Sequence, residues 1–436
     1  MERYIRQTFA IIALIYLSMI VSAATILFDV FPSEHFLRSV KGGYALYLLT
    51  KNYLSTSSGR PSEHSWYPVR SNAVGLTKND ASKTSDGVTF YLVSPLQKAE
   101  LLSMDGKVLH TWHLPYSKIW EDGDPIVDPI KDEDIAWEFA YPFPNGDILV
   151  VFRANYKVPY GYGMAKIDKD SNLIWKNLDT FHHELDVTVD GRIFAMSQYI
   201  TERSVHGAPQ IESPMVEDFL VELDGDGQII RKVSVFDALL DSPFKLFLRR
   251  IPGSRVGDYL HVNSVEYIDA ERARLLPFAN EGELLVSLRN PSMVVVVDMD
   301  EGNVVWALHG PWSEQHDTNI LENGNLLIFD NRGHVGNGGV TRVIEYDTVL
   351  QNTVWEYTGS EAEPLETVKR GSQDRLANGN TLITESHAGR LLEVNRAGEI
   401  VWEYRTPERW IGEKGDSYVP YIRYARRFPI DWFKLD

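Results

Sequence analysis

Short apolar runs separated by turn residues fill most of the chain. Strings such as NILENGNLLIFD (319–330) and RLANGNTLITES (375–386) place Asn-Gly between two apolar runs. Asn-Gly and Asp-Gly are strong hairpin signals, because a type I′ turn needs positive φ at both central residues. Comparable hairpins lie at 141–152, 186–197 and 278–288. This pattern predicts an all-β body.

A second kind of hairpin, which ends in Trp or an equivalent residue, alternates with the first. Examples are VVVVDMDEGNVVW (294–306) and RLLEVNRAGEIVW (390–402). The turn glycines of the first hairpins recur about every 45 residues, apart from an insertion of helical character at roughly 234–260. Four strands in every ~40–50 residues are typical of a β-propeller.

Six such units account for the body. Five contain all four predicted strands, and they span 136–176, 183–233, 261–308, 316–357 and 373–404. The sixth has only the hairpin at 89–114, so its two inner strands are predicted to come from 416–428. Closing the ring with both ends of the chain removes exposed strand edges. We therefore expect a six-bladed β-propeller with four-stranded antiparallel blades.

The N-terminal region has a different pattern. Residues 8–28 carry no charge, and about 20 apolar residues suffice to cross a bilayer as a helix. Arg3 and Arg6 precede this run, so the positive-inside rule keeps the N-terminus cytoplasmic. A cleaved signal peptide ending near Val21-Ser22-Ala23 is the alternative, but the apolar run continues to Phe28. We expect one transmembrane helix that anchors the protein.

Three regions follow from these patterns. Residues 1–32 form a cytoplasmic stub and the anchor, 33–87 a membrane-proximal segment and linker, and 88–436 the propeller. The chain has no cysteine and no Asn-x-Ser/Thr sequon, which favours a bacterial periplasm over a eukaryotic lumen. We expect a single-pass protein whose propeller lies on the extracytoplasmic side.

The composition limits which partners and which catalytic residue types are possible. The 436 residues include 43 Lys and Arg against 61 Asp and Glu, a net charge of −18, which argues against a nucleic-acid partner. The absence of cysteine excludes disulfides, thiolate metal sites and cysteine nucleophiles. Catalysis would therefore use residues such as His, Arg, Asp and Glu. The sequence does not fix an oligomeric state.

Histidines and arginines gather at one predicted end of the ring. His183, His261 and His316 each open the first strand of three successive units. The loop after the second strand of a unit faces the same end, because the second strand runs back towards it. These loops carry Arg153, Arg289, Arg332, His334 and His387. Since inner strands converge on the channel, we expect these side chains to meet at its mouth.

Several interpretations of this cluster remain open. A histidine in a propeller blade often braces its neighbour. A metal site is less expected, because the arginines would repel a cation, and the acidic residues at 122–134 are typical of a solvated loop. An anionic ligand fits the clustered positive charge best. Tyr162, Tyr199 and Trp312 lie in loops of the same end, where they either stack on a ligand or pack in the core. We expect no metal and no cofactor.

Histidine with arginine support indicates transfer of an anionic group. A neutral imidazole can attack sulfur or phosphorus in an anionic ester and hold the group covalently. The planar guanidinium of arginine matches the oxygens of such a group. A second histidine can serve as acid and base.

Four strings resemble the arylsulfotransferase family: DYLHVNSVEY (258–267), QHDTNILENGNLLIFDN (315–331), TRVIEYD (341–347) and ANGNTLITES…GEIVWEY (377–404). The resemblance covers roughly 90–405. It implies a six-bladed propeller that moves a sulfuryl group from a phenolic sulfate ester to a phenol through a sulfated histidine, without a nucleotide donor.

The resemblance also implies site residues. His261 and His316 match the two channel histidines of the family, and Arg332 matches its sulfate-binding arginine, with Arg342 as the alternative. His387 is the candidate for the sulfated nucleophile. The other expected substrate-binding residues are His183, Arg289, Asn331 and His334.

The chain departs from the periplasmic bacterial enzymes of the family. It lacks their N-terminal β-sandwich and cysteine pair, so it resembles a shorter, membrane-linked branch. Two other functions remain open. One is a non-catalytic, membrane-tethered propeller that binds an anionic ligand or a protein partner. The other is a lyase or hydrolase acting on an anionic glycan.

Overall fold

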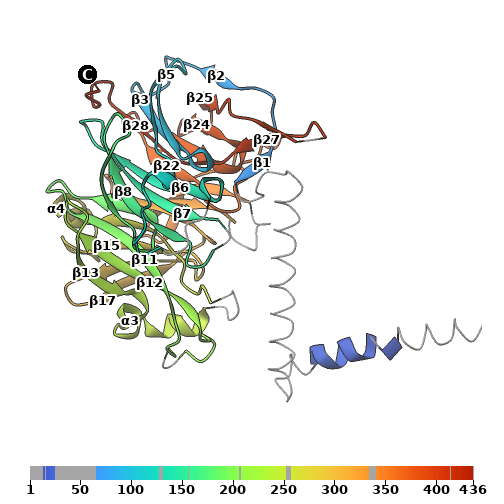
Figure 1. Ribbon diagram of the computed structural model, residues 1–436, viewed down its shortest axis with the longest axis vertical. Helices are drawn as coiled ribbons and strands as arrows, with labels where there is room; N and C mark the ends of the chain where they lie inside the picture. The colour runs from blue at the N-terminus through green and yellow to red at the C-terminus, as the bar shows by residue number, and fades with distance from the viewer. Residues whose placement is uncertain are drawn as a thin grey trace, which may run out of the picture. The chain divides into compact units, whose positions relative to one another are not determined.

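The structure, a computed structural model, describes residues 13–14, 16–24, 65–126, 131–155, 157–205, 208–251, 257–332, 340–412 and 414–435. The chain divides into two compact units. Glu63–Ile411 with Asp416–Asp436 form the larger unit, which contains all the described sheets (Figure 1).

Five sheets of the larger unit correspond to the five complete sequence repeats. In each sheet the strands are antiparallel and lie in chain order. They are β6 (Ile135–Pro142), β7 (Ile148–Ala154), β8 (Gly161–Ile167) and β9 (Leu173–Asn177); β10 (Phe181–Val187), β11 (Ile193–Thr201), β12 (Met215–Leu223) and β13 (Ile229–Ser234); β14 (Val262–Tyr267), β15 (Leu284–Leu288), β16 (Met293–Asp298) and β17 (Asn303–His309); β18 (His316–Ile320), β19 (Leu326–Asp330), β20 (Arg342–Asp347) and β21 (Asn352–Tyr357); and β22 (Ser372–Arg375), β23 (Thr381–Glu385), β24 (Arg390–Val394) and β25 (Ile400–Arg405).

The sixth sheet joins the two ends of the larger unit. Its order is β28 (Ile422–Phe428), β3 (Val88–Val93), β4 (Lys98–Ser103) and β5 (Val108–His113). Figure 1 shows β3, in blue, beside β28, in red. Each of these six sheets is a blade.

The innermost strands of the blades form a closed circuit. β28, β6, β10, β14, β18 and β22 each contact the next, and β22 contacts β28. Half-buried carboxylates join several of them, because an acid on one inner strand accepts a hydrogen bond from a backbone N–H of the next. Asp186 accepts from Tyr267 at 2.9 Å and Glu266 from Ile320 at 2.8 Å. The prediction of an all-β, propeller-like fold with four-stranded antiparallel blades is confirmed.

The predicted closure of the ring is half wrong. Residues 416–428 were expected to supply two inner strands, but only β28 enters the sixth blade. The second strand is β3, whose six residues are all buried. The segment 89–114, predicted as a two-stranded hairpin, therefore supplies three strands of the blade. β27 (Ser417–Pro420) instead pairs with β1 (Trp66–Pro68) and β26 (Trp410–Ile411) in a separate three-stranded sheet.

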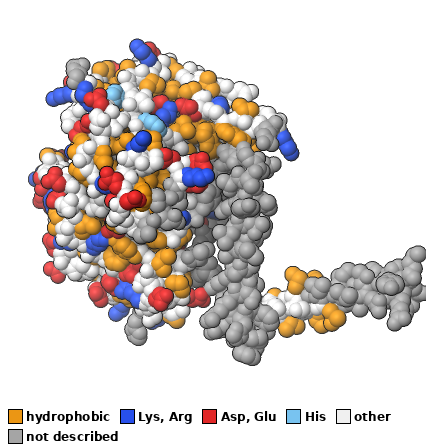
Figure 2. All heavy atoms as spheres, viewed as in Figure 1, with side chains coloured by type: hydrophobic (Ala, Val, Ile, Leu, Met, Phe, Trp, Pro, Cys, Tyr) orange, Lys and Arg blue, Asp and Glu red, His pale blue; other side chains and the backbone are white. Residues whose placement is uncertain are grey.

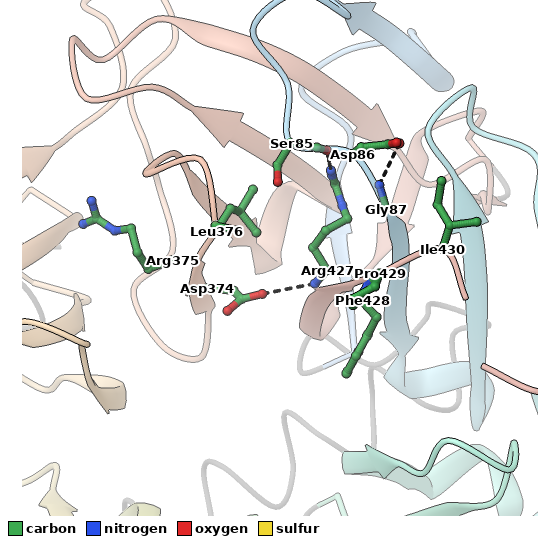
Figure 3. Close-up of a pocket in the computed structure, with 11 residues that line it drawn as sticks. Ser85, Asp86, Gly87, Asp374, Arg375, Leu376, Arg427, Phe428, Pro429 and Ile430 are labelled. Atoms are coloured by element: carbon green, nitrogen blue, oxygen red, sulfur yellow. Dashed lines mark hydrogen bonds between the residues drawn. The ribbon is translucent and has the colours of Figure 1, made fainter. Parts of the chain in front are cut away.

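Arg427 fastens this closure (Figure 3). Its backbone N–H donates to Asp374 at 3.1 Å, and its guanidinium donates to the carbonyl oxygen of Ser85 at 2.5 Å. Gly87 has a φ of 145°, and a Cβ there would lie 2.4 Å from the carbonyl oxygen of Phe428. The backbone of β28 therefore passes so close that only glycine fits at the start of β3.

Part of the predicted linker, 33–87, contributes to the sheets. β2 (Gly75–Asn79) pairs with β25 and gives the last blade a fifth strand. The described part of the linker begins at Ser65, directly before β1. The insertion at 234–260 carries α3 (Val235–Leu240) and the 3₁₀ helix at Lys245–Arg250, as its pattern indicated.

The predicted anchor lies in the other unit. Residues 13, 14 and 16–24 are helical, and their larger apolar side chains are exposed, with Leu14 and Tyr16 each 66% accessible. None of the helices among the described residues has the length and apolar character needed to cross a bilayer. The rest of 8–28 lies outside the described residues. The transmembrane helix stays a prediction.

Candidate functional site

Three of the predicted histidines meet at one end of the channel. His183 lies in β10, His261 directly precedes β14, and His316 opens β18. The ring centroids of His183 and His261 are 5.0 Å apart, and those of His183 and His316 are 6.5 Å apart. His183 and His261 have φ values of 54° and 51°, which ordinary residues rarely adopt. These two residues belong to neighbouring blades, and at both of them a left-handed backbone accompanies the side chain that reaches the cluster.

His261 is held by a carboxylate and is the most accessible of the three. Its Nδ1 lies 2.5 Å from Oδ2 of Asp258, and its side chain is 19% exposed. Burial by itself would raise the pKa of Asp258, but the adjacent imidazole outweighs this and lowers that pKa overall. An ionised Asp258 accepts a hydrogen bond from Nδ1–H of His261, and in the neutral tautomer that makes this bond the lone pair is on Nε2.

His316 is fixed at both ring nitrogens. Its Nδ1 donates to Oδ1 of Asn331 at 2.6 Å, and its Nε2 accepts the backbone N–H of Arg370 at 3.3 Å. Burial, followed by the charge of Arg423, lowers the pKa of His316 well below its usual value. The amide of Asn331 donates to the carbonyl oxygens of Thr367 and Arg370. Asn331, predicted to bind substrate, therefore holds His316 in place.

His183 has an imidazole partner that the sequence analysis did not single out. Nδ1 of His182 lies 2.9 Å from Nδ1 of His183, and a β-bulge after His182 brings both rings together. Nε2 of His183 lies 3.8 Å from Oε1 of Glu138. Burial lowers the pKa of His183 well below its usual value, and His261 and His182 add to this. The doubled histidine in HHELDV was the available signal.

Two buried arginines, Arg423 and Arg370, and the partly buried Arg153 lie near the three imidazoles. Arg423 of β28 pairs with Glu138 at 3.3 Å, and Arg153 lies 3.9 Å from the other oxygen of that carboxyl. Burial would raise the pKa of Glu138, but Arg423, Arg153 and Arg370 lower it overall. Arg153 was placed at this end from its loop, whereas Arg423 and Arg370 were missed. Arg370 shares the left-handed backbone of His183, with a φ of 69°, just before β22.

Two predicted arginines share one carboxylate at the mouth. Arg289 donates to Glu314, and Nε of Arg332 lies 3.0 Å from the same oxygen. Arg332 is 51% exposed and Arg289 only 13%. Lys369 lies near them, and burial followed by Arg370 and Arg153 lowers its pKa to about 7. An anion at this mouth would compete with Glu314 for both guanidiniums.

Arg342 and His334 are not part of the described cluster. Arg342 donates to Asp330 at 2.8 Å, to Glu356 at 3.0 Å and to the carbonyl oxygen of Pro311 at 2.5 Å. These bonds join β20 to β19, to β21 and to the loop before β18, so Arg342 stabilises its own blade and the loop that leads into it. His334 lies outside the described residues.

His387 lies beside the cluster under a tyrosine. It occupies the 3₁₀ turn Ser386–Ala388, and its ring stacks on Tyr67 with centroids 3.9 Å apart. Burial, followed by Arg370 and Lys369, lowers the pKa of His387 to about 2. Its Nε2 is buried and forms no hydrogen bond with any described residue. The guanidinium of Arg370 donates to the hydroxyl of Tyr67 at 2.9 Å and links this pair to His316.

The aromatic residues at the site are not the predicted ones. Tyr160 packs against His182, His183 and His261, with centroid distances of 5.3, 5.5 and 5.7 Å. Tyr162 and Trp312 are buried, and Tyr199 donates to Asp179 at 2.6 Å. The packing alternative therefore holds for those three.

The charge pattern of the site contrasts with the surface. Figure 2 shows acidic, basic and apolar side chains intermixed over the face in view. Among the described residues, no group of three or more His, Asp or Glu is arranged to hold a metal ion. The imidazoles with four nearby arginines, Arg153, Arg289, Arg370 and Arg423, fit a small anion instead.

Solved structures offer weak likenesses. A protein of unknown function from Bacteroides caccae aligns at 13% identity and a TM-score of 0.46, over 73% of this chain and 93% of its own. Virginiamycin B lyase from Staphylococcus aureus aligns at 9% identity and a TM-score of 0.36, over 67% and 83%. The WD40 β-propeller domain of Doa1 aligns at 9% identity and a TM-score of 0.39, over 85% and 99%. At these scores they carry no functional argument.

No curated protein matches the chain. A family model described as arylsulfotransferase (ASST) matches residues 142–407. This span runs from the end of β6 to just past β25, so it takes in His183, His261, His316 and His387. The match covers more than half of the chain, and the protein therefore belongs to the arylsulfotransferase family.

Proposed function

We propose that this protein is an aryl sulfotransferase. It moves a sulfuryl group from a phenolic sulfate ester to a phenol or another hydroxyl acceptor through a sulfated histidine, without a nucleotide donor. Family membership implies a transferase for small aryl substrates. The observation that carries the finer proposal is the contact of His183, His261 and His316 among buried arginines.

The chemistry has two steps. In the first, an imidazole Nε2 attacks sulfur, the N–S bond forms, and the S–O bond to the donor phenol breaks. In the second, the acceptor oxygen attacks sulfur, the N–S bond breaks, and the acceptor loses its proton. Fixed positive charges stabilise the sulfuryl oxygens in both transition states, and here Arg153, Arg370 and Arg423 supply them.

We assign the sulfur-accepting nitrogen to Nε2 of His261. Asp258 engages its Nδ1, it is more exposed than His183 and His316, and Tyr160 packs beside it. His316 is less suited, because Arg370 already bonds to its Nε2. His387, predicted as nucleophile from the resemblance, has an unengaged Nε2 but lies under Tyr67. It remains the alternative.

We also propose that the apolar N-terminal segment anchors the protein, with the blades on the extracytoplasmic side. The exposed apolar side chains of the helix at residues 16–24 support an anchor, and Arg3 and Arg6 support this orientation. Reporter fusions after residue 62, which is still within the N-terminal unit, would test it. Activity of a cytoplasm-specific reporter at that point would contradict it.

The enzymatic test uses the full chain with a nitrophenyl sulfate and no nucleotide. We expect rapid release of one nitrophenolate per enzyme and an added mass of SO₃ on the peptide that contains His261. His261→Asn should remove the adduct, and His387→Asn should leave it. An adduct on the His387 peptide would reverse the assignment. Tight binding of the aryl sulfate with no release would instead favour a non-catalytic binding protein.

A further inference from the structure

A line of buried side chains leads from the histidine cluster into the protein. His183 contacts His182 through their Nδ1 atoms at 2.9 Å, and Nε2 of His182 lies 3.4 Å from Oδ1 of Asp218 in β12. The side chains of His182 and Asp218 are 0% and 1% exposed. Among the described residues neither Nε2 of His182 nor Oδ1 of Asp218 forms a hydrogen bond, so the 3.4 Å approach between them is the only polar contact described for either atom.

The position of each proton follows from the end of this line. When Asp218 is ionised, Nε2 of His182 carries its proton towards the carboxylate. Nδ1 of His182 is then an acceptor, so Nδ1 of His183 must be the donor in the bond between the rings. Nε2 of His183, which lies 3.8 Å from Oε1 of Glu138, therefore holds a lone pair. His182 and Asp218 fix the tautomer of His183 without touching substrate.

We propose that Asp218, His182 and His183 form a proton relay that removes the proton of the acceptor hydroxyl during sulfuryl transfer. This proposal rests on the sulfotransferase function proposed above. His183 is the catalytic base at the mouth, and His182 and Asp218 are positioning residues that carry the proton onward.

The bonds and protons balance in one step. The acceptor O–H bond breaks as an N–H bond forms at Nε2 of His183, and the acceptor oxygen bonds to sulfur as the N–S bond of the sulfated histidine breaks. The Nδ1 proton of His183 moves to Nδ1 of His182, and the Nε2 proton of His182 moves to Asp218. Both imidazoles end neutral, and the carboxylate is neutralised. The reverse path can protonate a departing donor phenolate.

The charges around His183 explain why its added proton should move to Asp218. An imidazolium at His183 would add a positive charge beside Arg423, and burial with His261 and His182 already depresses the pKa of His183. Burial raises the pKa of Asp218, so this carboxylate is the better resting place. The groups that face Asp218 are His182 on β10, Asp258 and His261 before β14, and the N–H of Val262, which donates at 3.3 Å.

The proton relay is tested by comparing an acceptor that must lose a proton with one that is already ionised. The full chain is loaded from a nitrophenyl sulfate, whose leaving group needs no proton, and then offered either unsubstituted phenol or a phenol that is ionised at the assay pH. Asp218→Asn should keep the nitrophenolate burst, lower turnover with phenol about 100-fold, and leave turnover with the ionised acceptor unchanged.

His182→Gln separates a relay from simple support. The Gln carbonyl can accept from Nδ1 of His183 but cannot pass a proton, so we expect the same selective loss. His110→Gln is the matched control, because His110 lies on the outer strand β5 and bonds to the carbonyl oxygen of Lys169 at 2.8 Å. It should change neither acceptor.

The outcomes separate the two proposals. Full turnover of His182→Gln with phenol, or equal losses with both acceptors in Asp218→Asn and His182→Gln, would overturn the relay while the burst upholds the sulfotransferase. No burst in the unaltered protein would overturn both.

Discussion

The ring of Tyr67 lies flat on the imidazole of His387, with the two planes inclined by 14°. Tyr67 belongs to β1, which precedes every blade strand in the chain, whereas His387 belongs to the last complete repeat. A segment from outside the predicted propeller therefore covers the residue that the family resemblance marks as nucleophile. Access to His387 depends on Tyr67.

Removal of this cover should expose His387. In the unaltered protein we expect diethyl pyrocarbonate to modify His261 faster than His387, because the side chain of His261 is partly exposed whereas the ring of His387 is stacked on Tyr67. Tyr67→Ala should accelerate modification of His387, and Tyr67→Phe, which keeps the stack, should not. Peptide mass spectrometry over time measures both rates. Equal rates at the two histidines in the unaltered protein would contradict the stacked arrangement.

Asn331 should matter for stability as well as for the site. Asn331→Leu leaves the Nδ1–H of His316 and the carbonyl oxygens of Thr367 and Arg370 without their partner. Each unsatisfied buried group costs about 1–3 kcal/mol, so we expect a loss of about 3 kcal/mol or more in urea unfolding. Asn145→Ala, in an exposed hairpin turn, is the control and should cost less than about 1 kcal/mol. A similar loss in both variants would refute the role of Asn331.

The ion pair between Arg423 and Glu138 should couple the closing strand to the next blade. Arg423→Met leaves a buried carboxylate with only partial compensation from Arg153, so we expect a loss of about 3 kcal/mol. Glu138→Gln in that background should recover part of it. The double-mutant cycle by urea unfolding gives the coupling, expected between about 0.5 and 3 kcal/mol. Strict additivity would show that the two residues do not interact.

Stability should fall as pH rises through the neutral range because of Glu266. Burial raises its pKa to about 7, against about 4.3 in an unfolded chain. A raised folded pKa means that the folded state binds the extra proton, so this contribution is full below pH ~4.3 and is lost as pH rises through about 7. Glu266→Gln should therefore show a smaller decline between pH 5 and 8. An unchanged decline, measured by urea unfolding, would contradict this.

The repeat pattern was enough to predict the blades but not the closure. Asn-Gly turns and alternating runs fix local pairing, so all five complete repeats appear at the predicted places. Ring closure depends on long-range pairing, and β3 is a short, fully buried run whose partner lies more than 300 residues away. Nothing in the local pattern of 88–93 shows that β28 will pair with it.

The site, like the fold, could be predicted only in part from the sequence. His183, His261 and His316 follow from their equivalent positions in successive repeats. Arg370 occupies a comparable position but was passed over because the repeat there begins with a different residue type. Arg423, Glu138 and Asp218 were not predictable, because their roles depend on which side chains fill a buried channel. His182 meets His183 because of a β-bulge, which the sequence does not reveal.

The order in which the strands are synthesised determines when the histidine cluster can assemble. β28 emerges from the ribosome after every other blade strand, and it brings Arg423 with it. Until then β3 has a free edge, Glu138 lacks its closest cation, and the histidine cluster lacks one wall. A nascent chain that stops short of residue 422 thus has all the candidate histidines and no assembled site. The last blade strand therefore completes the histidine and arginine cluster only after all the other blade strands have been made.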